Sequence, residues 1–204
     1  MEINVHDIVF LKSNEEVEIF EHKPSWLLID EMANQMAVVR RMKVTGEKIA
    51  IGFRGDNRSK RLAAFTSRQN IERFIRPIDV LELSPPASHE KSIKLLKEIL
   101  YGFTWGIGGS VGFSMATGIL VCHEHSDIDV IIYLDSISDV PKLEALKPKL
   151  SQCVNTLDIQ IEIRGLGCVV LEDILHNETF IVRTPTGPIL FERSRLSIER
   201  VRWE

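Results

Sequence analysis

The sequence predicts an α+β protein with two small domains. Its 204 residues include 44% hydrophobic side chains, enough to bury one good core or two modest ones. Short segments rich in β-branched residues, typical of strands, are interspersed with segments of helical spacing. The clear break is Pro85-Pro86, because proline lacks a backbone donor and favours an extended residue before it. We therefore expect an N-terminal α+β domain over residues 1–84 and a second domain over residues 88–204.

One helix and three strands are expected in the N-terminal domain. The helix is expected over residues 26–35, after Pro24 and Ser25, because its apolar residues have helical spacing. The strands are expected where short runs of branched residues occur, over residues 6–11, 36–42 and 47–53.

The second domain is expected to alternate helices with the strands of one sheet. A helix is predicted over residues 88–102, since its apolar residues share one face and Gly102 is placed to end it. Two more helices are expected, over 111–117 closed by Gly118 and over 138–152 with a bend or break near Pro148. The strands are expected over 103–107, 128–134 and 156–163, followed by a hairpin over 180–192 around Gly187.

Charge and composition exclude several classes of protein. The net charge of −4 gives no basic field, so we expect neither a nucleic-acid partner nor a membrane surface. No apolar run is long enough to span a bilayer and the first ten residues lack the features of a secretion signal, which favours a cytoplasmic protein. The three cysteines match neither a metal knuckle nor a disulfide framework, so reduced thiols are expected at Cys122, Cys153 and Cys168.

Two acids open the apolar strand at 128–134. Asp127 and Asp129 project to the same side of a strand, where at about 7 Å their repulsion would be about 2 kcal/mol. A bound cation would reverse that sign, and Mg²⁺ suits carboxylates that share it with substrate phosphates. The alternative is a solvated strand entrance in which Ser126 and Asp127 form a turn.

A Gly-Gly-Ser segment lies upstream between an expected strand and an expected helix. Gly108 and Gly109 would let backbone amides approach a phosphate, and the hydroxyl of Ser110 could donate to it at the helix start. The alternative is a tight turn in which Ser110 only caps the helix.

Together these motifs resemble the nucleotidyltransferase superfamily related to polymerase beta. The sixteen residues 111–126 between the serine and the first acid exceed the usual spacing in that superfamily. After Gly-Ser, the segment contains an aromatic residue, A-T-G and S-D-I-D in this order. This arrangement is similar to that of the phosphoribosyl-dephospho-CoA transferase that acts as holo-acyl-carrier-protein synthase of malonate decarboxylase. The resemblance spans nearly the whole chain, through WLLIDEMANQMAVVRR at 26–41, GFRG at 52–55 and FIVRTPTGPILF at 180–191.

The resemblance implies a nucleotidyltransferase-like mixed sheet with flanking helices in the second domain, and a specific reaction. A serine of the apo acyl carrier protein of malonate decarboxylase would attack triphosphoribosyl-dephospho-CoA and release pyrophosphate. Metal-binding carboxylates dominate such a site, because phosphoryl transfer mainly needs alignment and charge neutralisation. We assign Mg²⁺ to Asp127 and Asp129 and the triphosphate to Gly109 and Ser110. The N-terminal domain would recognise the substrate or the carrier protein.

Members of the superfamily commonly carry a third acid on a neighbouring strand. Asp158 and Glu162 share one face of the strand at 156–163, and both are candidates. We prefer Asp158, because it lies at the start of its strand as the first pair of acids does. The alternative for either acid is an exposed sheet face, since Gln160 lies on the same face.

A basic group follows the strand at 47–53. Arginine presents a planar fork suited to phosphate, so this group could bind the triphosphate, the diphosphate of the substrate or an acidic carrier. Arg54, between two glycines, is the preferred residue, whereas a hairpin tip facing water is the alternative for Arg58 and Lys60. The predicted substrate-binding arginines are Arg54, Arg58 and Arg61, with Arg40 and Arg41 upstream.

Two other functions stay open at this point. A different nucleotidyltransferase would share the site but use ATP or another nucleotide, and a noncatalytic module would keep the fold without the chemistry. The intact acids and the Gly-Ser motif argue against the second. His123 and His125 lack a third ligand in the sequence and are assigned no zinc.

Overall fold

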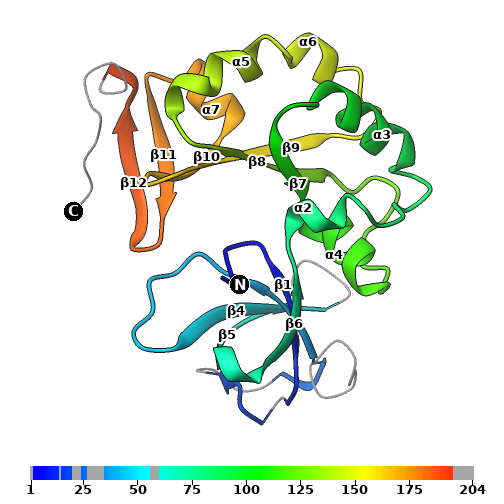
Figure 1. The fold of residues 1–204 in the computed structure, drawn as a ribbon, viewed down its shortest axis with the longest axis vertical. Coiled ribbons are helices and arrows are strands. Elements are labelled where there is room, and N and C mark those ends of the chain that lie inside the picture. The colour runs from blue at the N-terminus through cyan, green and yellow to red at the C-terminus, as the bar shows by residue number, and fades with distance from the viewer. Residues whose placement is uncertain (1, 14, 20–23, 27–34, 56–59, 195–204) are drawn as a thin grey trace.

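Two six-stranded sheets, one from each half of the chain, form the framework of the protein (Figure 1). The computed structural model describes residues 2–13, 15–19, 24–26, 35–55 and 60–194. The predicted α+β class is confirmed, because the chain forms two sheets and helices that pack on the second sheet. The predicted boundary at residues 84–88 stays a prediction.

The N-terminal sheet has the strand order β2-β5-β4-β3-β1-β6, and every pairing that the structure describes in it is antiparallel. The three predicted strands are present as β1, β3 and β4, whereas residues 27–34 of the predicted helix lie outside the described residues. The strands are β1 (Ile8–Leu11), β2 (Glu18–Ile19), β3 (Met36–Val39), β4 (Lys48–Arg54), β5 (Arg61–Ser67) and β6 (Ile71–Ile75).

The C-terminal sheet has the order β12-β11-β10-β9-β8-β7. Its β8–β9 pair is parallel and its other described pairs are antiparallel, so it is the mixed sheet that was expected. The sequence did not indicate β10, whose four residues are too few to give a clear alternation. The strands are β7 (Thr104–Ile107), β8 (Ile128–Leu134), β9 (Leu157–Ile163), β10 (Gly167–Val170), β11 (Thr179–Thr184) and β12 (Gly187–Glu192).

Helices α3, α5, α6 and α7 lie on the side of this sheet that is turned away from the N-terminal sheet, whereas α2 and α4 lie toward the N-terminal sheet (Figure 1). The predicted helix over 138–152 is split, and the break falls at Ala145-Leu146, before Pro148. Pro148 lies in the first turn of the next helix, where proline loses no hydrogen bond. The helices are α2 (Pro77–Val80), α3 (Glu90–Ile99), α4 (Gly109–Thr117), α5 (Val140–Glu144), α6 (Lys147–Leu150) and α7 (Leu171–His176).

The two halves of the chain meet through apolar and polar contacts. Phe113 of α4 packs against Ile8, Phe10 and Met36 of the N-terminal sheet. The backbone N–H of Lys43 also donates to the carbonyl of Pro185, at the turn between β11 and β12, over 2.6 Å. Glu162 of β9 faces the N-terminal half, where it contacts His6, while its neighbours Ile161 and Ile163 pack in the core with the helices.

Asp7 is an acid buried at the start of β1, with 1% of its surface exposed. Its Oδ2 atom accepts from the backbone N–H of Asn4 over 2.8 Å. Burial raises the pKa of Asp7 from 3.8 to about 6, against the lowering effect of that hydrogen bond and of Arg76. The folded protein therefore keeps the Asp7 proton at pH values where the unfolded chain has released it.

We predict that Asp7→Asn stabilises the protein increasingly as pH rises. The folded-state pKa is raised, so the stability associated with protonated Asp7 is complete below about pH 4 and lost as pH rises through about 6. The difference between 3.8 and about 6 is worth up to about 3 kcal/mol. Urea unfolding at pH 4.5 and 7.5 measures it. Asp135→Asn, at an exposed acid, is the control, and an equal gain for Asp7→Asn at both pH values would contradict the prediction.

Candidate active site

The parallel pairing of β8 and β9 brings two of the predicted acids together. Asp129 is the register partner of Asp158, and neighbouring strands lie about 4.8 Å apart. Asp127 comes one residue before β8 and is half-buried, as are the other two acids. Three carboxylates therefore gather where both strands begin.

The electrostatics of Asp129 reflect this crowding. Burial raises the pKa of Asp129, and the negative charges of Asp158 and Asp127 raise it further. The positive charges of Arg54 and His6 oppose the rise without cancelling it. The folded protein holds a carboxylate that is costly to ionise, with cations from the N-terminal half placed near it.

A divalent cation fits this arrangement. The residues that could hold it are Asp127, Asp129 and Asp158, which supply carboxylate oxygens, the ligands that Mg²⁺ prefers. Bound positive charge would offset the repulsion that raises the pKa of Asp129. The donor set is therefore suited to Mg²⁺, and the assignment of the metal stays a proposal.

The Gly-Gly-Ser segment lies directly beside Asp129. The N–H of Gly108 donates to the carbonyl of Asp129 over 2.9 Å, which extends the β7–β8 pairing. Gly109 has φ +60°, and a β-carbon there would collide with the carboxylate of Asp129. Only glycine allows this approach, because it combines a left-handed backbone with the absence of a side chain.

Helix α4 starts at this turn. Gly108 is its N-cap residue and, as a glycine, has no side chain to accept from the first amides. Ser110 is the second helical residue and is not the cap. The amides of the first turn have no partner within the helix, and among the described residues the Ser110 hydroxyl makes no hydrogen bond. The helix therefore presents backbone donors and a hydroxyl beside the acids, as a phosphate site requires.

The predicted arginines separate into different positions. Arg54, at the end of β4, places its guanidinium carbon 5.7 Å from the ring centroid of Phe113 in α4, and its charge acts on Asp129. Arg61 is its register partner on β5 and is exposed. Arg58 lies outside the described residues. The structure thus brings Arg54 to the acids and does not bring Arg61 there.

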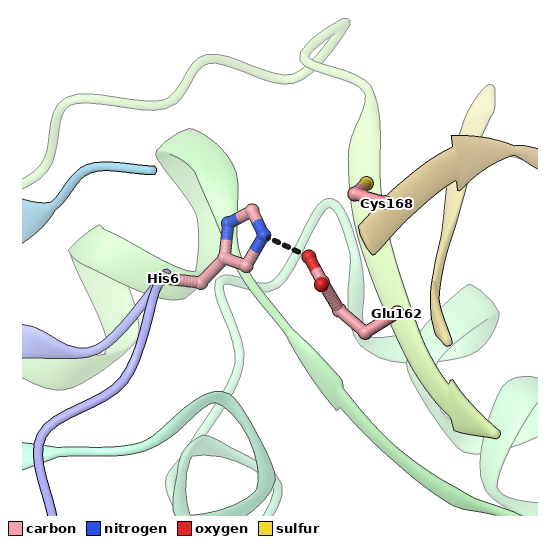
Figure 2. Close-up of side chains that lie close together, drawn as sticks. All are labelled: His6, Glu162 and Cys168. Carbon is pink, nitrogen blue, oxygen red and sulfur yellow. Dashed lines mark hydrogen bonds and ion pairs between the residues drawn. The ribbon is translucent and has the colours of Figure 1, made fainter. Parts of the chain in front are cut away.

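Glu162, the other candidate for the third acid, is held by the N-terminal half of the chain. Its Oε1 atom lies 2.8 Å from Nε2 of His6 (Figure 2), and the guanidinium of Arg41 donates to the same oxygen. Burial would raise the pKa of Glu162, but the hydrogen bond from His6 and the charges of Arg41 and His6 hold it below its ordinary value. Its carboxylate is committed to an ion pair between the two sheets.

Cys168 faces the same ion pair, and His6, Glu162 and Cys168 have the residue types of a metal site (Figure 2). Arg41 already supplies a positive charge to the glutamate oxygen. Burial, followed by the negative charge of Glu162, raises the pKa of the Cys168 thiol to about 12. A protonated thiol and a guanidinium-bound carboxylate do not suit a cation, so this cluster is an ion pair between the two sheets.

Gln160 lies between the two candidate acids on β9. Its amide Nε2 donates to Oδ2 of Asp158 over 3.1 Å, and its Oε1 atom lies 3.7 Å from the sulfur of Cys168. The sequence suggested Gln160 only as a sign of an exposed face. In the structure it fixes one oxygen of the third carboxylate.

A cleft of about 450 Å³ borders Asp127 and Asp158. Its walls include the apolar residues Leu150, Leu157 and Leu171 and the polar residues at the start of β9. The acids therefore stand at the rim of a space large enough for part of a small-molecule substrate.

Family comparisons cover nearly the whole chain. The phosphoribosyl-dephospho-CoA transferase MdcG C-terminal domain matches residues 75–194, and the N-terminal domain of the same enzyme matches residues 4–77. This chain belongs to the phosphoribosyl-dephospho-CoA transferase family. The expectation of an enzyme of this family is confirmed.

Curated relatives named phosphoribosyl-dephospho-CoA transferase are 26–30% identical to this member of the family over the aligned residues. The relative from Pseudomonas fluorescens strain Pf0-1 is 30% identical over 163 residues, which cover 78% of this chain and 79% of the relative. One from Azotobacter vinelandii is 29% identical over 177 residues and 82% of each chain. One from Klebsiella pneumoniae is 28% identical over 189 residues, covering 89% of this chain and 91% of its own. No solved structure gives a significant match.

The structure also describes the two histidines that were assigned no zinc. His123 and His125 are exposed in the loop before β8, and His125 pairs with Glu124. Within the described ranges, the helices are too short or too polar to cross a bilayer.

Sequence reasoning missed the residues that act across the chain. His6 and Arg41 reach Glu162 from 156 and 121 residues away. Arg41 was noted only as part of a basic group, and His6 gave no signal, since a lone histidine before a strand has no distinguishing pattern.

We predict that Gly109→Ala abolishes tight binding of a divalent cation while the protein stays folded. The new β-carbon would displace the carboxylate of Asp129 and force an alanine into a left-handed backbone, a strain of about 1–2 kcal/mol. Mn²⁺ binding measured by electron paramagnetic resonance reports the effect.

Gly118→Ala is the matched control at the other end of α4. Gly118 has φ +75° and nothing within 4 Å of an added β-carbon, so the variant shares the strain without the collision. Unchanged Mn²⁺ affinity in Gly109→Ala, or an equal loss in Gly118→Ala, would show that the contact with Asp129 does not matter for the metal.

Proposed function

We propose that this protein transfers the phosphoribosyl-dephospho-CoA group from triphosphoribosyl-dephospho-CoA to a serine of the acyl carrier protein of malonate decarboxylase, with release of pyrophosphate. The observation that carries the proposal is the gathering of three carboxylates beside a glycine turn at the start of α4. Membership of the phosphoribosyl-dephospho-CoA transferase family supports the donor substrate.

The chain's own residues would bind and align the triphosphate. The amides at the start of α4 and the Ser110 hydroxyl are donors for phosphate oxygens, and Arg54 adds a positive charge from the N-terminal sheet. Asp127 and Asp129, joined by Asp158, would hold Mg²⁺ next to these oxygens. When bound, Mg²⁺ supplies charge neutralisation on the phosphates and lowers the pKa of the acceptor hydroxyl.

The transfer is a single in-line displacement. The serine oxygen forms a bond to the α-phosphorus while the bond from that phosphorus to the oxygen bridging to the β-phosphate breaks. Pyrophosphate leaves with the electron pair. The carboxylate of Asp158 accepts the serine proton and is kept in place by Gln160. The cleft beside Asp127 and Asp158 leaves room for a group that approaches from the rim.

Intact-mass spectrometry of the carrier protein tests the reaction. The pure protein, Mg²⁺, triphosphoribosyl-dephospho-CoA and apo-carrier should give a serine adduct and one pyrophosphate per adduct, and a chelator should stop both. Asp127→Asn and Asp129→Asn should each lower the rate by at least about 10²–10³-fold, the usual cost of removing a preorganised charge. Consumption of ATP or another nucleotide with no adduct on the carrier would replace the proposed substrates, and an active Asp127→Asn/Asp129→Asn variant would refute the metal site.

A matched pair on β9 tests which residue is the third carboxylate. Asp158→Asn and Glu162→Gln make the same change at two positions of one sheet face. We expect Asp158→Asn to lower kcat by about 10²-fold or more. Glu162→Gln should keep kcat within a few-fold, because it weakens only the ion pair with Arg41 and His6. A large loss of kcat in folded Glu162→Gln, with kcat kept in Asp158→Asn, would assign the role to Glu162, and equal losses in both variants would refute the preference for Asp158.

A further inference from the structure

A buried histidine at the start of α3 holds the loop that leads into the acid-bearing strand β8. His89 is 0% exposed, and its Nε2 atom lies 2.9 Å from the carbonyl oxygen of Ser126. Its Nδ1 atom lies 2.9 Å from the hydroxyl of Ser88. Because a carbonyl only accepts, Nε2 carries the proton and Nδ1 accepts from Ser88. Both ring nitrogens are used within the protein, and the ring has no exposed surface from which to reach a substrate.

The bonded carbonyl belongs to the residue directly before Asp127. Ser126 is 7% exposed and closes a turn, since its N–H donates to the His123 carbonyl over 2.9 Å and its hydroxyl accepts from the His123 N–H over 3.0 Å. Asp127 precedes the first residue of β8, so the pairing of the strand does not begin until after it. The bond from His89 fixes the backbone at the point from which the Asp127 side chain departs.

The same helix holds the loop that leads into β9. The hydroxyl of Ser92, one turn after His89 and 1% exposed, donates to Oδ1 of Asn155 over 2.8 Å and accepts from its backbone N–H over 3.2 Å. Asn155 also donates to the carbonyl of Glu124 over 3.4 Å. One turn of α3 therefore forms hydrogen bonds to both loops that lead to the edge of the sheet where the three carboxylates gather.

We propose that His89, assisted by Ser92, is a positioning residue that sets the spacing of the metal-binding carboxylates. The inference rests on the proposed function. The negatively charged carboxylates at this edge repel one another, so their side chains would move apart unless hydrogen bonds held their backbone in place. A hydrogen bond from a fully buried helix start supplies that restraint on the Asp127 side, and Ser92 supplies it on the Asp158 side. Residues that orient metal ligands commonly change metal affinity by about 10- to 100-fold when they are replaced.

The experiment compares Mn²⁺ affinity of the purified full-length protein and its variants by electron paramagnetic resonance. His89→Leu removes the donor to Ser126, and we expect it to weaken Mn²⁺ binding about 10-fold or more. His89→Gln places an amide N–H where Nε2 lies and should restore affinity to within about 3-fold of wild type. Hydrogen exchange of residues 123–127 should rise in His89→Leu and not in His89→Gln.

Leu143→Ala is the control for destabilisation alone. Leu143 is 0% exposed on α5 and packs in the same core as α3, but it contacts neither loop through a hydrogen bond. It should unfold at lower urea concentration and keep wild-type Mn²⁺ affinity. Should His89→Leu fail to fold, Ser92→Ala tests the other arm and should also weaken Mn²⁺ binding.

The outcomes separate the inference from the proposed function. Wild-type Mn²⁺ affinity in folded His89→Leu, or in Ser92→Ala, would overturn the positioning role. An equal loss of affinity in Leu143→Ala would overturn it too, because stability alone would then account for the effect. Absence of Mn²⁺ binding by the wild-type protein would instead overturn the proposed metal site, and the inference with it.

Discussion

The parallel pairing of β8 with β9 is the constraint on which the rest of the site depends. It aligns Asp129 with Asp158 and leaves Asp127 at the same edge, so the fold places like charges together where they raise the pKa of Asp129. This costs stability, and the surrounding elements reduce the cost in different ways. Gly109 allows a helix start to touch the carboxylate, and Arg54 brings a positive charge from the other half of the chain.

The N-terminal sheet contributes charged residues to the candidate site. It contributes Arg54 near the acids and the Arg41–His6 pair that holds Glu162. Glu162 is thereby paired on the sheet face that also carries Asp158. The apolar contacts of Phe113 with β1 and β3 keep this geometry, since they join α4 to the N-terminal sheet directly. In the proposed reaction, groups from both halves would therefore act on one phosphate.

Much of the fold could be predicted, because its long elements have strong patterns. Strand β8 was predicted with its observed bounds, and α3, α4 and the terminal hairpin within about three residues. The helix over 138–152 was predicted to bend or break near Pro148, and the structure breaks it at Ala145-Leu146, because proline fits the first turn of a new helix better than the interior of a long one. Strands β2, β5, β6 and β10 and helices α2 and α7 were not predicted, and most of them are too short for their period to be read.

The sequence alone determined the local chemistry: two acids separated by one residue, a glycine turn before a helix, and the family to which the chain belongs. Local motifs can be recognised in the sequence because their residues are close together in the chain. Only the tertiary structure decided which distant groups join them. It pairs Asp158 with Asp129, commits Glu162 to Arg41, brings Arg54 and not Arg61 to the acids, and places His89 under the loop before Asp127. Strand order and the packing of one sheet on another set these partners, and neither leaves a periodic trace in the sequence.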